Sequence, residues 1–163
     1  MRTCVVTFLL LLAAVKVIGQ DERIEVVFSY GRYGKDKLDS AAGTFTKDMV
    51  CDPSVTVVLM LSQTERQRIL KMAEAVGFFE MPERLQPDDA TYRSYALPDP
   101  NNEYSLEIVA SGERRVVRWN DAILKPWPER ERAELLVKFI QLIVFSKREY
   151  REMPQQRCYY GHI

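Results

Sequence analysis

Histidine is nearly missing from this sequence of 163 residues: its single copy, His162, is the last residue but one. Because residues near chain ends are usually poorly ordered, we expect His162 to be a poor general base. A second histidine would be needed for a histidine-based zinc site, and a well-placed one for a Ser-His-Asp triad. We therefore predict no catalytic residues, no metal and no cofactor.

A net charge is also missing, because 23 Lys and Arg residues balance 23 Asp and Glu residues. Such a chain has no strong overall field to attract nucleic acid or an anionic membrane surface. We therefore expect no nucleic-acid partner. Glycine and proline number only 7 and 8, and 47% of the residues are hydrophobic, so collagen-like and disordered chains are excluded.

Long hydrophobic runs are absent except near the start. Arg2 precedes an apolar stretch over residues 4–15, and Val17 and Gly19 supply small residues after it. This layout is typical of a secretory signal peptide, and the stretch is shorter than the ~20 residues that span a bilayer. We predict a signal peptide over residues 1–19, one domain over residues 20–163, and a secreted or periplasmic protein without a membrane span in its mature chain.

Cysteine is scarce, with three copies, and Cys4 lies in the predicted signal peptide. The other two, Cys51 and Cys158, would enter an oxidising compartment, where an even number of cysteines usually pairs. We predict a disulfide between them that ties a turn in the first half of the chain to the C-terminal tail. Two free thiols and an incomplete metal site are the alternatives.

Several segments alternate between apolar and polar residues or are rich in β-branched residues, which predicts strands. They cover residues 23–30, 44–50, 55–61, 104–110 and 115–119, with a further short strand over 91–97. The strand over 55–61 is expected to be buried on both faces. Polar loops are expected over 31–42 and 83–102, and the glycines of the first do not have the spacing of a phosphate-binding loop.

Two helices are predicted between these strands. The first begins at Ser62, whose spacing to Glu65 forms a capping box, and ends at Gly77. The second begins at Pro128 and runs for about 20 residues with a broad apolar face. The order of elements predicts an α+β fold: a mainly antiparallel sheet of about five to six strands with two helices packed on one face.

Charged residues offer the remaining candidates for a ligand site. Asp88 and Asp89 lie in the loop over 83–102, and Arg114, Arg115 and Arg118 cluster on the last hairpin, where they could grip a carboxylate or phosphate. The loop would have to fold against the hairpin to form a pocket. A solvated turn and a charged sheet edge are the alternatives.

Aromatic residues offer a second candidate surface. Trp119, Trp127, Tyr159 and Tyr160 could form a recognition patch, although Trp127, between two prolines, could equally staple the start of the second helix.

Four segments carry a resemblance to a known family. They are the helix start Leu61–Glu65, the run Gly77-Phe78-Phe79-Glu80-Met81-Pro82, the hairpin Tyr104–Trp119, and Tyr150-Arg151-Glu152-Met153-Pro154 after the long helix. The chain resembles, over most of residues 23–155, a family of uncharacterised secreted or periplasmic bacterial domains. The resemblance implies an extracytoplasmic α+β domain without a known activity, so it supplies no catalytic residues.

Three functional hypotheses follow. The first is a non-enzymatic binding module of the cell envelope or secreted space, with a protein partner or an envelope component. The second is a small-ligand-binding protein or hydrolase that uses the loop carboxylates and the arginine cluster. The third is an assembly subunit of a larger envelope complex.

Overall fold

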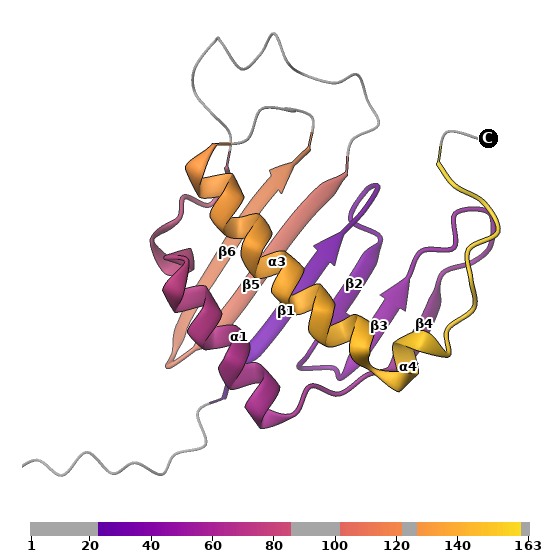
Figure 1. The fold of residues 1–163 in the computed structure, drawn as a ribbon, viewed down its shortest axis with the longest axis horizontal. Coiled ribbons are helices and arrows are strands. Elements are labelled where there is room, and N and C mark those ends of the chain that lie inside the picture. The colour runs from indigo at the N-terminus through magenta and orange to yellow at the C-terminus, as the bar shows by residue number, and fades with distance from the viewer. Residues whose placement is uncertain (1–22, 86–101, 122–126, 161–163) are drawn as a thin grey trace, which may run out of the picture.

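The computed structural model describes residues 23–85, 102–121 and 127–160. Within them, a six-stranded antiparallel sheet is covered on one face by two long helices (Figure 1), as the sequence predicts for an α+β fold. In chain order the described elements are β1 (Glu25–Tyr30), β2 (Asp36–Asp39), β3 (Thr44–Lys47), β4 (Val55–Val58), α1 (Gln63–Ala75), the 3-10 turn η1 (Phe78–Glu80), β5 (Glu103–Ala110), β6 (Glu113–Asn120), α3 (Pro128–Ser146) and α4 (Arg148–Arg151).

The strands are arranged in the order β4-β3-β2-β1-β5-β6, so β1 lies near the centre between β2 and β5. The chain after β4 passes through α1 and returns to the other side of β1 as the β5–β6 hairpin. The hairpin is the one that the alternation predicts, with Leu106 opposite Val117. The strand expected over 91–97 lies outside the described residues.

Two strand expectations are wrong. Residues 36–39 form β2, although the sequence predicts a loop there. Asp and Lys are poor strand formers, and here the pairing of buried Leu38 with Phe28 and Phe45 outweighs that preference. The strand that begins at Val55 ends at Val58, which is 71% exposed rather than buried. Val57 pairs with buried Phe45, so Val58 lies on the other face of the sheet, which the helices do not cover.

The hydrophobic core lies between the sheet and the two helices. Helix α1 contributes Ile69 and Ala73, and α3 contributes a broader buried stripe that includes Leu136 and Ile140. The core-facing residues of the sheet include Val26, Phe28, Leu38, Phe45, Leu106, Ile108 and Val117. Because side chains alternate along a strand, the residues between them face away from the helices.

The ends of the helices follow the predicted signals. The Ser62 hydroxyl accepts a hydrogen bond from the Glu65 amide at 3.2 Å, and Glu65 Oε2 accepts one from the Ser62 amide at 2.8 Å. The same carboxylate binds Lys147 Nζ at 2.6 Å, which joins the start of α1 to the end of α3. Gly77 has a φ of 66°, the left-handed conformation that glycine adopts most readily after a helix.

The C-terminal tail is attached to the turn between β3 and β4. Cys51 and Cys158 form the predicted disulfide, with their Cα atoms 5.9 Å apart. Gln156 Nε2 donates to the Asp48 carbonyl at 2.6 Å, and Arg157 Nε donates to Asp52 at 3.0 Å. In Figure 1 the tail, drawn in yellow, runs beside this turn. No helix in the described ranges is long and apolar enough to cross a membrane.

Candidate functional site

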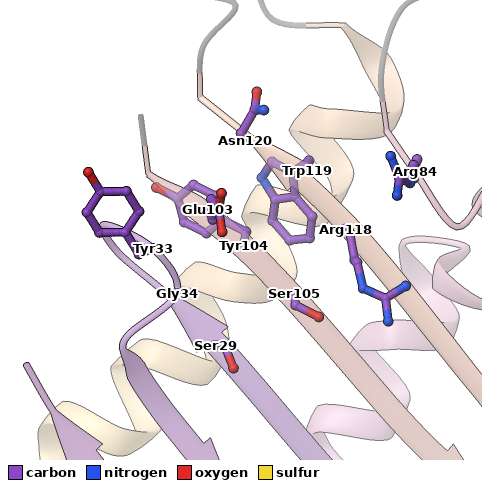
Figure 2. A pocket seen from close by; sticks show the side chains of 10 residues that line it. All are labelled: Ser29, Tyr33, Gly34, Arg84, Glu103, Tyr104, Ser105, Arg118, Trp119 and Asn120. Atoms are coloured by element: carbon purple, nitrogen blue, oxygen red, sulfur yellow. The ribbon is translucent and has the colours of Figure 1, made fainter. Parts of the chain in front are cut away.

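The sheet face opposite the helices carries a row of polar side chains on three neighbouring strands. Ser29 of β1 pairs with Ser105 of β5, and Ser105 pairs with Arg118 of β6. Residues that pair across antiparallel strands lie on the same face. Figure 2 shows the three side chains in a line across the strands.

A short segment after η1 extends this row beyond β6. The Leu85 amide donates to the Arg118 carbonyl at 2.9 Å, and the Arg118 amide donates to the Glu83 carbonyl at 2.8 Å. These two bonds place Arg84 directly beside Arg118 in a parallel bridge. Two guanidinium groups therefore come from neighbouring backbone positions at one end of the row.

These side chains line a hollow with a volume of about 420 Å³, which we call the arginine hollow (Figure 2). Its size lies in the range typical of sites for small molecules. Its lining residues are Ser29, Tyr33, Gly34, Arg84, Glu103, Tyr104, Ser105, Arg118, Trp119 and Asn120.

One side of the arginine hollow is formed by the turn between β1 and β2. Tyr33 lies there with a φ of 60°, between Gly31 and Gly34, which also have positive φ. A positive φ is uncommon for a bulky residue and carries strain, which often marks a functional position. The Gly31 carbonyl fixes the turn, because it accepts from the Gly34 amide at 3.1 Å and from the Glu103 amide at 2.9 Å. The Tyr33 side chain is 53% exposed.

Charge is unevenly distributed around the hollow. Arg118 forms an ion pair with Glu83, but the two side chains are 47% and 67% exposed, so water screens the pair. Within the described part of the chain, the Arg84 side chain forms no ion pair or hydrogen bond. Glu103 contributes a carboxylate from the beginning of β5. The end at Arg84 and Arg118 is therefore positive.

The predicted arginine cluster is divided by the alternation of β6. Arg118 lines the arginine hollow, whereas Arg114 is held by Glu107, with bonds of 2.7 and 2.8 Å, outside the lining. Arg115 pairs with core-facing Ile108 on the opposite face, where its Nε is buried without a hydrogen-bond partner. Asp88, Asp89 and His162 lie outside the described residues.

The aromatic residues do not form the patch that the sequence suggested. Trp119 and Trp127 are buried, and Trp119 stacks on Tyr104 with ring centroids 5.2 Å apart. The guanidinium carbon of Arg32 lies 4.4 Å from the centroid of the Tyr160 ring, and Tyr159 is exposed.

Sequence reasoning missed Tyr33 and Arg84, as well as the two serines. A signal was present for Ser29, which is polar on the outward side of a predicted strand, and for Tyr33, which lies between two glycines. Arg84 gave no comparable signal, because its place in the row depends on pairing with a strand more than 30 residues later.

A second group of ionisable side chains lies under the C-terminal tail. Asp36 Oδ1 accepts from the Asp48 amide at 3.0 Å, and the Asp48 carboxylate accepts from the Val50 amide and the Tyr160 hydroxyl. Burial, together with the nearby Asp48 carboxylate, raises the pKa of Asp36 above its usual value. Among the described residues no group of His, Cys, Asp and Glu side chains could hold a metal ion. The hydrogen bond from the Tyr160 hydroxyl to the Asp48 carboxylate attaches the tail to this end of the sheet.

Replacement of Asp36 by Asn is expected to stabilise the protein at neutral pH, because the folded state then no longer contains a partly buried charge. The folded-state pKa of Asp36 is raised, so the wild type gains stability as the pH falls through that pKa. The advantage of Asp36→Asn should therefore shrink towards pH 4. Urea unfolding of both proteins from pH 7 to pH 4 measures this difference. A constant difference would show that the Asp36 carboxylate does not titrate as described.

The geometry defines an α+β domain with a polar, partly cationic hollow on its open sheet face. No protein-family model and no curated protein sequence matches this chain. The resemblance to uncharacterised secreted domains therefore stays a prediction, and the function has to be argued from the arginine hollow itself.

Proposed function

We propose that this protein is a non-enzymatic binding module of the cell envelope or secreted space, and that the arginine hollow holds an anionic group of its ligand. The observation that supports this most directly is the pairing of Arg84 with Arg118 at one end of the hollow. Guanidinium groups bind carboxylates and phosphates through two parallel hydrogen bonds. Two of them side by side favour an anion over a neutral group.

The lining favours binding over catalysis. Among the described residues around the hollow, Ser29 and Ser105 carry hydroxyls, but neither forms a hydrogen bond to a base that could activate it as a nucleophile. Glu103 is the one carboxylate among the lining residues, and the neighbouring Glu83 carboxylate is paired with Arg118. Glycoside hydrolysis usually uses two carboxyl groups that flank the scissile bond. Hydroxyls, an amide and guanidinium groups are suited to recognising a ligand.

An extracytoplasmic site of action is supported by two features of different kinds. The Cys51–Cys158 disulfide is of a type that persists in oxidising compartments and is rare in the cytosol. Residues 1–19 have the layout of a signal peptide. Both features fit a protein that meets its ligand outside the cytoplasm.

The double variant Arg84→Ala/Arg118→Ala is expected to bind anions at least about tenfold more weakly than the wild type, which corresponds to about 1.4 kcal/mol. Isothermal titration at low ionic strength with phosphate, citrate and an acidic disaccharide measures the effect. Arg114→Ala is the matched control, because Arg114 lies on the same strand but outside the hollow. The proposal fails if none of these anions binds, or if the double variant binds them as tightly as the wild type.

A further inference from the structure

Resting on that proposed function, we propose that the ligand of the arginine hollow is an acidic saccharide, with a carboxylate on a sugar ring. The carboxylate lies at Arg84 and Arg118, the sugar hydroxyls face Ser29 and Ser105, and a ring packs against Tyr33. The argument depends on three features of the lining: an anion-binding end, a row of hydroxyls and an exposed aromatic ring.

The row of side chains has the length for such a ligand. Neighbouring strands lie about 4.8 Å apart, so the three steps from Ser29 to Ser105, Arg118 and Arg84 cover about 14 Å. A free phosphate would occupy only the arginine end of this row. A ligand of two linked rings would cover most of this row.

The middle of the row is suited to hydroxyl groups. Neither Ser29 nor Ser105 forms a hydrogen bond through its side chain within the described chain, and each hydroxyl can both donate and accept. Sugar hydroxyls have the same double capacity. Glu103, next to this row, supplies a further acceptor for a sugar O–H. A peptide would offer fewer groups that can both donate and accept.

The far side of the hollow is suited to the apolar face of a sugar ring. Tyr33 is held at the rim by backbone of positive φ, and about half of the residue is accessible. The Arg32 guanidinium carbon and Lys35 Nζ lie 5.5 and 5.8 Å from the centroid of its ring, so a sugar would pack on the part of the ring that these cations leave open. The face of an aromatic ring is electron-rich, and it attracts the weakly positive C–H groups of a saturated ring. The strained backbone therefore holds an aromatic surface at the end of a polar row.

The arginine end selects for acidic sugars over neutral ones. Glu83 holds one N–H group of Arg118 from the side, which limits the orientations of that guanidinium. Arg84, whose side chain forms no ion pair in the described chain, lies next to it. A carboxylate between the two would accept charge-assisted hydrogen bonds, which are about twice as strong as neutral ones. A neutral sugar has no carboxylate to accept these charge-assisted hydrogen bonds.

Titration of the full chain with two acidic disaccharides, digalacturonic acid and the hyaluronan disaccharide, tests the inference. Cellobiose serves as the neutral disaccharide, and citrate serves as the anion that is not a sugar. We expect at least one acidic disaccharide to bind one-to-one, and to bind at least about tenfold more tightly than cellobiose. Arg84→Ala/Arg118→Ala should abolish that preference. Tyr33→Ala should weaken the binding of the acidic disaccharide about tenfold and leave the affinity for citrate unchanged.

Tyr159→Ala is the matched control. It removes a tyrosine that is 65% exposed and does not line the hollow, so this variant should bind like the wild type. If citrate binds through the arginines and neither acidic disaccharide binds more tightly than cellobiose, the saccharide inference is overturned and the proposed function stands. Unchanged disaccharide binding by Tyr33→Ala also overturns it. If no anion binds, both proposals fall.

Discussion

Replacement of Cys51 and Cys158 by serine is expected to lower the free energy of unfolding by about 4 to 5 kcal/mol. The two cysteines are 107 residues apart in the sequence, so their bond closes a large part of the chain into one loop. In the chain-entropy model, a loop of that length strongly restricts the unfolded state. For a domain of this size the melting temperature should fall by about 10 to 20 °C.

Thermal unfolding followed by circular dichroism, with and without reductant, measures the loss. The tail contacts should not compensate, because the Arg157–Asp52 pair lies at the surface, where water screens it. Arg157→Ala is therefore the control, and its melting temperature should stay close to that of the wild type. The prediction is wrong if the double cysteine variant and the reduced wild type both unfold at the temperature of the oxidised protein.

The sequence predicts those parts of the fold that depend on neighbouring residues. The capping box needs only Ser62 and Glu65, and the β5–β6 hairpin needs only alternation around the turn at Ser111 and Gly112. The disulfide is predicted because two cysteines remain after the signal peptide, and an even number of cysteines usually pairs in an oxidising compartment. Strand β2 could not be recognised in this way, because its stability comes from the contacts of Leu38 with two other strands.

The arginine hollow could be predicted only in part. Alternation in β6 already separates Arg115 from Arg114 and Arg118, so the sequence contained the signal that the three do not form one cluster. Arg84 joins Arg118 through backbone bonds between segments far apart in the sequence, and the β-strand order places Ser29 beside Ser105. The first relation depends on an isolated bridge and the second on the strand order, and no local pattern contains either.

Arg66 of α1 is the subject of the second large prediction, since its guanidinium links the helix to the sheet. Its Nε donates to the Leu61 carbonyl at 3.2 Å, its Nη1 to the Ile24 carbonyl at 2.9 Å, and its Nη2 to the Ser40 carbonyl at 2.9 Å. All three acceptor residues are buried. Hydrogen bonds from a charged donor contribute about 1.5 to 3 kcal/mol each, and buried carbonyls without a donor destabilise the folded state.

Arg66→Met is expected to lower the free energy of unfolding by at least about 3 kcal/mol, because the methionine keeps most of the apolar stem and removes every donor. Urea unfolding measures the change, and Lys71→Ala, an exposed cation on the same helix, should leave the midpoint nearly unchanged. Arg66→Lys restores the charge and one donor group but not the three-way geometry, so it should recover only part of the loss. If Arg66→Met unfolds at the wild-type midpoint, packing alone holds α1 against β1 and the three carbonyls find water instead.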